Sequence, residues 1–251
     1  MKKKYGVILL GGLILCAGFC LAKNRYDGHK NCLSKCTSES WLYEKCSFNW
    51  GTGGCSYMTK EPIAMKPIIY LYPEEITNVT IALGYPENAT HTYPKYQGPW
   101  LVQAEPNGDL TDLKTGRHYY ALYWEGKTTV STVTPTEGFV IKGEETISFL
   151  EEKLDQLGLT EREAEEFIVY WLPKLESSPY NFIRFQTLDE QNKNMPLTIA
   201  PAPKTLIRVM MEYDNLDNPI QIKEQTLPAK PERNGFTVVE WGGTKLNIKE
   251  K

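Results

Sequence analysis

Histidine is scarce in this chain of 251 residues, which contains only His29, His91 and His118. His29 and His91 have no neighbouring partner at the spacing of metal ligands, and His118 follows Arg117 at the start of a strand-like segment. A lone histidine in such a position is typically a hydrogen-bonded surface residue. The sequence therefore predicts no histidine-based metal site and no bound metal.

Short motifs of the common enzyme classes are also missing. The chain has no G-x-S-x-G nucleophile elbow, no P-loop, no H-E-x-x-H zinc motif and no dinucleotide-binding fingerprint. We therefore expect no cofactor. These absences favour a protein that is not an enzyme, without excluding one.

Clusters of basic residues are absent beyond Lys4, although the chain contains 28 Lys and Arg against 31 Asp and Glu. Binding to phosphate groups needs clustered Lys and Arg, so the pattern argues against nucleic acid or an anionic membrane surface as a general partner. The formal net charge is −3, and removal of residues 1–22 with their three lysines moves it to −6.

The first 22 residues have the pattern of an export signal. Three lysines at positions 2–4 precede an apolar run from Tyr5 to Ala22, which matches a positive n-region followed by an h-region. Cys20 and Ala22 are the small residues expected before a cleavage site that follows Ala22. We therefore expect an exported protein, either secreted, periplasmic or displayed on the cell surface.

Two alternatives to a cleaved signal remain open. The apolar run is close to the length of a membrane-spanning helix, so residues 5–22 could stay as an N-terminal anchor. A lipoprotein is the second alternative, but Cys16 follows Leu15 and Cys20 follows Phe19, where a lipidated cysteine needs a small residue before it.

The remaining cysteines lie together in residues 23–60. They are Cys32, Cys36, Cys46 and Cys55. Four cysteines in an oxidising compartment predict two disulfides, with three possible pairings. A zinc site is the alternative, although the spacings lack the repeated C-x2-C pattern. We favour a small disulfide-stapled segment whose loops are too poor in apolar residues to hold themselves.

The segment from Lys66 to Leu83, "KPIIYLYPEEITNVTIAL", opens the main part of the chain after a connector at residues 60–66. Residues 68–72 are apolar on both faces, as in a central, doubly covered strand, and Pro73 should end that strand. Alternation over residues 79–83 predicts a second, half-buried strand. The segment is therefore expected to build the core.

Further strands are predicted along the rest of the chain. They cover residues 100–106, 118–124, 138–143, 181–187, 205–213 and 235–243. The residues before 143 are expected to form a β-meander.

Between these strands the apolar period becomes helical. The residues that recur at this spacing are Ile147, Leu150, Leu154 and Leu157, followed by Ala164, Phe167, Ile168, Trp171, Leu172 and Leu175. Gly158 suits the position just after a helix, and residues 160–163 form a capping box for the second helix. Pro173 should kink or stop that helix. The pattern predicts a helical hairpin at about residues 144–175.

Together these patterns predict an α+β fold. We expect a mainly antiparallel, sandwich-like β-sheet with the helical hairpin inserted and covering one face, in a main domain of residues 61–251. The signal or anchor at 1–22 and the cysteine-rich segment at 23–60 precede it.

Two carboxylates are weak candidates for catalysis. Glu125 follows Trp124, and Glu240 precedes Trp241, each near the end of an apolar strand and next to glycine. A pair of carboxyls beside indole rings could act as acid and base on a glycoside. Such a pair should face one open cleft, about 5–10 Å apart. In the alternative, each glutamate pairs with an arginine, for which the candidates are Arg117, Arg184, Arg208 and Arg233.

Aromatic residues are weak candidates for binding. Tyr93 and Tyr96 lie in "HTYPKYQGPW", which ends at Trp100. A loop rich in Tyr, Pro and Gly is suited to recognition of a glycan or peptide, and Trp124 and Trp241 could stack on a sugar ring. Alternatively, these rings fill the end of the sheet.

Several motifs recur in the order of a known family. They are "KPIIYLYPE", "YYALYWEG", the hairpin "FLEEKLDQLGL…EFIVYWLPKLE", "YNFIRF" and "GFTVVEWGG". Over residues 67–243 the chain resembles a widespread family of uncharacterised exported microbial proteins. The resemblance implies a single domain and brings no activity, cofactor or catalytic residue.

Three functions follow as expectations. The first is a non-catalytic exported or cell-envelope domain that binds a protein or glycan partner. The second is a glycan-directed hydrolase that uses Glu125 and Glu240. The third is a purely structural envelope component anchored through residues 5–22.

Overall fold

A computed structural model describes residues 24–35, 43–50, 52–59, 63–128, 135–246 and 248. The chain forms two compact units, Met1–Lys60 and Glu61–Lys251. The predicted export signal at residues 1–22 lies outside the described residues. Within the ranges that are described, no helix is long and apolar enough to cross a membrane.

The first unit contains a helix over residues 24–35 and the antiparallel hairpin of β1 (Tyr43–Asn49) and β2 (Gly54–Thr59). Cys32, which is the buried residue of the helix, forms a disulfide with Cys55 on β2. Cys46 is also disulfide-bonded, and Cys36 lies outside the described residues. The predicted stapling is confirmed, and the Cys32–Cys55 bond removes the zinc alternative for these two sulfurs.

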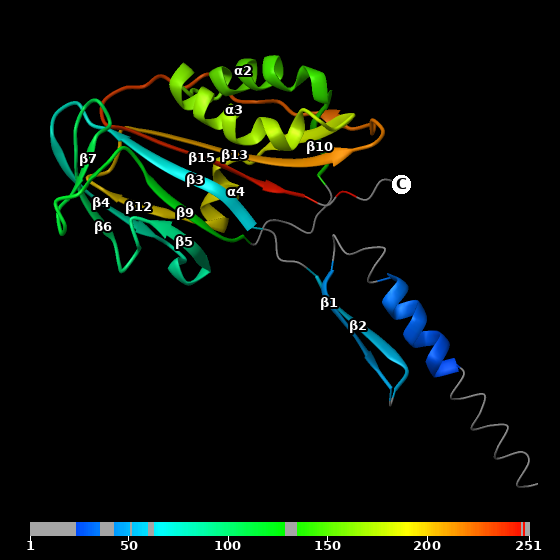
Figure 1. Ribbon diagram of the computed structural model, residues 1–251. Helices are drawn as coiled ribbons and strands as arrows, with labels where there is room; N and C mark the ends of the chain where they lie inside the picture. Colours follow the sequence, from blue (N-terminus) through cyan, green and yellow to red (C-terminus); the bar gives the residue numbers. More distant parts are fainter. Residues whose placement is uncertain are drawn as a thin grey trace, which may run out of the picture. The chain divides into compact units, whose positions relative to one another are not determined.

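The described residues of the second unit form an eight-stranded and a five-stranded sheet, whose strands can be followed in Figure 1. The larger has the spatial order β14 (Lys223–Glu224), β10 (Glu137–Lys142), β11 (Tyr180–Phe185), β13 (Thr205–Leu216), β15 (Thr237–Lys245), β3 (Ile63–Tyr72), β9 (Leu122–Lys127), β5 (Ala89–Tyr93). The smaller has the order β12 (Leu197–Ala200), β4 (Thr77–Leu83), β6 (Trp100–Ala104), β7 (Leu110–Asp112), β8 (His118–Tyr119). Neighbouring strands are antiparallel except for the pairs β13–β15 and β10–β14.

The helices are α2 (Thr146–Gln156), α3 (Glu161–Leu175) and α4 (Leu188–Asn194), with 3-10 turns at Pro86–Asn88 and Gly143–Glu145. In Figure 1, α2 and α3 cover one face of the eight-stranded sheet, while the five-stranded sheet and α4 lie on the other side. The predicted α+β fold with an inserted helical hairpin is therefore confirmed.

Successive side chains of β3 point to opposite faces of the eight-stranded sheet. The strand therefore contacts both the helical hairpin on one side and the five-stranded sheet on the other. Ile68 and Tyr70 pack with the apolar stripe of the hairpin, including Phe167. Ile69 and Leu71 pack with the inner residues of the five-stranded sheet. The strand is thus covered on both sides, as its continuous apolar run predicts.

Two local predictions need correction, and one helix was not predicted. Residues 118–124 form two strands in different sheets, β8 and β9, because the chain crosses between the sheets at Tyr120 and Ala121. β3 begins at Ile63, inside the predicted connector. Helix α3 ends at Leu175, two residues after Pro173, in agreement with the predicted end of the hairpin. Helix α4 was not expected, although Thr187 caps it.

Candidate functional site

Glu240 does not face an open cleft. Its side chain is 0% exposed, and its Oε2 lies 2.6 Å from Nε of Arg208 on the neighbouring strand β13. The indole N–H of Trp124 donates to Oε1 of Glu240 over 2.8 Å. The arginine in turn donates to Asn192 Oδ1 and to the carbonyl of Met195. The carboxylate is therefore fully engaged in a buried polar network.

This placement removes the predicted acid–base pair of Glu125 and Glu240. The acid–base pair required that both carboxyls face one open cleft and that neither be paired with an arginine. Glu240 is buried and paired with Arg208, so it meets neither condition. Its network instead joins β9, β13 and β15 inside the core. Glu240 therefore has a structural role.

Glu125 lies on the opposite face of β9 from Trp124, because the two residues are adjacent on the strand. Its Oε1 accepts the backbone N–H of Lys66 over 3.1 Å, and its Oε2 lies 3.9 Å from Nδ1 of His91. Lys66 has φ of 55° at a bulge where the pairing of β3 with β9 shifts register. Glu125 thus holds an irregular part of β3 in place.

The aromatic candidates do not form one binding surface. Trp100, Trp124 and Trp241 are all buried, so their rings build the core and are not available to a ligand. Tyr96 packs edge-on against Trp100 at 4.9 Å, and its hydroxyl accepts the backbone N–H of Leu83. Of these five residues, only Tyr93 exposes a large part of its ring, with 51% of the residue accessible.

A groove of ≈ 310 Å³ lies elsewhere, between the start of α3 and the end of β3. Its lining residues are Tyr70, Tyr72, Asn107, Gly108, Asp109, Tyr120, Thr160, Arg162, Glu163, Glu166 and Arg233. They come from β3, the turn between β6 and β7, the connection between β8 and β9, the start of α3 and the loop before β15. This size is within the range of small-molecule sites, about 300–1,000 Å³.

Three tyrosines form the aromatic side of the groove. Tyr70 and Tyr72 are two residues apart on β3 and therefore share a face, and their rings are nearly parallel at 6.3 Å between centroids. Tyr120 lies between β8 and β9 and is 53% exposed. The turn between β6 and β7 closes against Tyr72 at Gly108, which has φ of +92° and leaves no room for a Cβ, since that atom would lie 2.8 Å from the ring.

The phenol groups of the groove stay protonated at neutral pH. Burial, together with the hydrogen bond from the Tyr70 hydroxyl to Glu166 Oε2 at 2.6 Å, raises the pKa of Tyr70 above its ordinary value of 10.0. Burial and the neighbouring Glu163 carboxylate raise the pKa of Tyr72, and burial and the charge of Glu166 raise that of Tyr120. The phenols are therefore neutral, and the Tyr70 hydroxyl donates its hydrogen bond to Glu166.

The opposite side of the groove is the first turn of α3. Glu163 is buried and completes the capping box, since its carboxylate accepts the N–H of Thr160. The same carboxylate pairs with Arg233, whose guanidinium also donates to the carbonyl of Gly158 over 2.9 Å. These contacts hold the start of α3 and the loop before β15 together at the groove.

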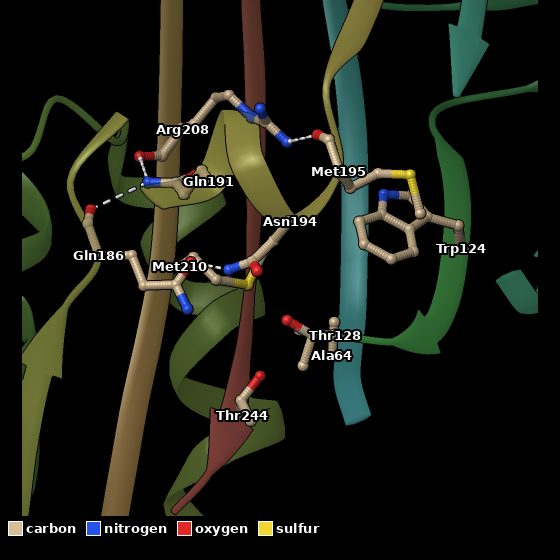
Figure 2. Close-up of a pocket in the computed structure, with 10 residues that line it drawn as sticks. All are labelled: Ala64, Trp124, Thr128, Gln186, Gln191, Asn194, Met195, Arg208, Met210 and Thr244. Carbon is tan, nitrogen blue, oxygen red and sulfur yellow. Dashed lines mark hydrogen bonds between the residues drawn. The ribbon is translucent and has the colours of Figure 1, made fainter. Parts of the chain in front are cut away.

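A second cavity, of ≈ 10 Å³, lies beside α4 near the Arg208 network (Figure 2). Gln191 donates from Nε2 to the carbonyls of Gln186 and Arg208, and its Oε1 has no protein partner. Thr244 Oγ1, also in the lining, has none either. A single water needs roughly 10–15 Å³ and two or more polar partners, so this space suits one water and no larger ligand.

Metal ligation finds no support in the described ranges, where no group of three or more His, Cys, Asp or Glu side chains could hold an ion.

The groove between β3 and α3 was not predicted from the sequence. Tyr70 and Tyr72 read as strand core, and Tyr120 was assigned to the interior of a strand. The available signal was the tyrosine spacing of two residues in "IIYLY", which places both rings on one face.

Comparison with known proteins assigns neither a family nor an activity to the chain. No protein-family model matches the chain, and no solved structure matches it. The chain is similar to an "Uncharacterized protein in bglA 3'region" of Butyrivibrio fibrisolvens, with 37% identity over 65 residues, or 25% of this chain and 66% of that protein. The chain thus spans just under two thirds of this relative's length, and the matched protein is described as uncharacterised.

Proposed function

We propose that this protein is an exported, non-catalytic domain that binds a glycan in the groove between the tyrosines of β3 and the start of α3. The observation that carries the proposal is the combination of aromatic rings and hydrogen-bonding groups around one open space of ≈ 310 Å³. Sugar rings present apolar faces for stacking and hydroxyls for hydrogen bonding, so they match such a lining.

The chemistry of the lining supports a glycan over a purely apolar ligand. Tyr72 and Tyr120 offer ring surface with a phenol hydroxyl, while Asn107, Arg162 and Glu166 offer amide, guanidinium and carboxylate groups. A ligand with many hydroxyls can replace the water at these groups, whereas an apolar ligand would displace that water and offer no hydrogen bonds in return. The lining therefore favours a glycan over an apolar ligand.

Replacement of Tyr120 by alanine should weaken glycan binding at least tenfold. The ring is the most exposed aromatic surface of the groove, and stacked aromatic contacts commonly carry much of a binding energy. The measurement is calorimetric titration of the purified protein with cello-, xylo-, malto- and chito-oligosaccharides.

Tyr93→Ala is the matched control for this experiment, because Tyr93 is similarly exposed but lies outside the groove. It should leave the affinity unchanged. If Tyr93→Ala abolishes binding and Tyr120→Ala does not, the groove is the wrong site. If none of the oligosaccharides binds the wild-type protein, glycan binding itself is wrong.

Export predicts a processed N-terminus. Cleavage after Ala22 would leave a mature chain that starts at Lys23, and the Cys32–Cys55 disulfide is compatible with an oxidising compartment. Intact mass and N-terminal sequencing of the protein recovered outside the cytosol should show this start. A full-length chain in the membrane fraction would support the anchor instead.

A further inference from the structure

Four of the five charged residues that line the groove form two ion pairs, Arg233 with Glu163 and Arg162 with Glu166. Arg233 and Glu163 form an ion pair in which the glutamate is buried, and the arginine also holds the carbonyl of Gly158. Breaking a pair with one buried member leaves a charge without compensation, which is costly. Neither member is therefore free to bind a ligand of opposite charge.

Glu166 is the more accessible carboxylate of the two ion pairs. Its side chain is 30% exposed, its Oε1 lies 3.6 Å from Nε of Arg162 one helical turn earlier, and its Oε2 accepts the Tyr70 hydroxyl. The tyrosine thus fixes the orientation of the carboxylate. Arg162 is largely exposed and presents further N–H donors at the rim.

Asp109, the third acid of the groove, is held within its own turn. Its carboxylate accepts from the side-chain amide of Asn107 over 2.9 Å, and its backbone N–H donates to the Asn107 side chain over 2.9 Å. The turn therefore contributes polar groups in a fixed arrangement.

We infer that the groove selects a neutral sugar chain, with Glu166 and Arg162 as the residues that recognise its hydroxyls. This inference rests on the proposed glycan-binding function. An anionic sugar would compete with Glu166 for Arg162 and meet the carboxylates of Glu166 and Asp109. A cationic sugar would compete with Arg162 for Glu166 and meet the Arg162 guanidinium at the rim. A neutral pair of hydroxyls can donate to Glu166 and accept from Arg162 while the ion pair stays intact.

The first test compares neutral and charged probes by calorimetric titration. The probes are cello-, xylo-, malto- and chito-oligosaccharides, an oligogalacturonate as the anion, and a chitosan oligosaccharide as the cation. At least one neutral probe should bind at least tenfold more tightly than both charged probes. Its affinity should change less than about twofold between low and high salt, because screening acts on net charge.

Two results would overturn the inference in different ways. Tighter, salt-dependent binding of a charged probe would contradict neutral selectivity while leaving glycan binding intact. Lack of binding by every probe would contradict the proposed function, and the inference would fall with it.

The second test uses variants on one helix. Glu166→Gln should lower the affinity for the neutral probe at least tenfold, since an amide replaces one of the two acceptor oxygens. Arg162→Gln should shift selectivity toward the chitosan oligosaccharide, since it removes a positive charge from the rim. The matched control is Glu165→Gln, an exposed neighbour outside the groove, which should change neither quantity.

Three results would contradict the roles assigned to these residues. Unchanged selectivity in Arg162→Gln would show that this guanidinium does not act on the ligand. Full affinity in Glu166→Gln would show that this carboxylate does not contact the ligand. If Glu165→Gln lowers the affinity as much as Glu166→Gln does, the effect comes from the overall charge of α3 and not from a contact of Glu166 with the ligand. Equal melting temperatures of the variants and the wild type would show that these losses do not arise from unfolding.

Discussion

Glu240→Gln is expected to lower the free energy of unfolding by about 3–5 kcal/mol, the usual cost of removing one member of a buried ion pair. The substitution leaves the Arg208 guanidinium buried and without its counter-charge, while the Trp124 indole can still donate to the new amide. Chemical denaturation followed by tryptophan fluorescence measures the change.

The control for this prediction is the double variant Arg208→Met with Glu240→Leu. Apolar replacement of both partners removes the uncompensated charge, so part of the lost stability should return. Wild-type stability in Glu240→Gln would contradict the structural role assigned to this glutamate and reopen its interpretation as a functional carboxylate.

Trp171→Ala is expected to lower the free energy of unfolding by about 3–5 kcal/mol, as large-to-small substitutions of buried aromatic residues commonly do. Its ring is fully buried and contacts Phe167 and Tyr213. It also packs on Gly243 of β15, where a Cβ would lie 2.7 Å from the ring. The indole thus fixes the hairpin on the sheet.

Val169→Ala on the same helix is the matched control, because Val169 is 68% exposed. It should change stability by no more than about 0.5 kcal/mol, as surface substitutions usually do. If the alanine variant of Trp171 unfolds at the same denaturant concentration as the wild type, the hairpin does not depend on this contact for its docking.

The helical hairpin was predictable from sequence because its determinants are local. Apolar spacing marks one face of each helix, Gly158 follows the first, and the Thr160–Glu163 capping box begins the second. The doubly buried strand at residues 68–72 was equally clear, since Pro73 marks its end.

The strand partners were not predictable, because they depend on contacts between distant residues. β3 and β4 follow each other in sequence but lie in different sheets. β13 and β15 pair in parallel, which places Arg208 opposite Glu240. No local pattern indicated that this arginine, of the four considered, would neutralise that glutamate.

The candidate site was missed for a related reason. Tyr72 reads as a buried strand residue, and Tyr120 lies in an apolar segment whose split between two sheets was not expected. Only the fold brings these rings to Glu166 and Arg162 on α3. In contrast, the tryptophans selected for their chemistry are buried, because large apolar rings near strand ends serve the core first.

A crystal structure of the protein soaked with the tightest-binding neutral oligosaccharide would test the central claim most directly. We expect a sugar ring against Tyr72 and Tyr120, with its hydroxyls within hydrogen-bond distance of Glu166. A sugar bound instead at Tyr93, or anywhere outside the groove, would contradict the account.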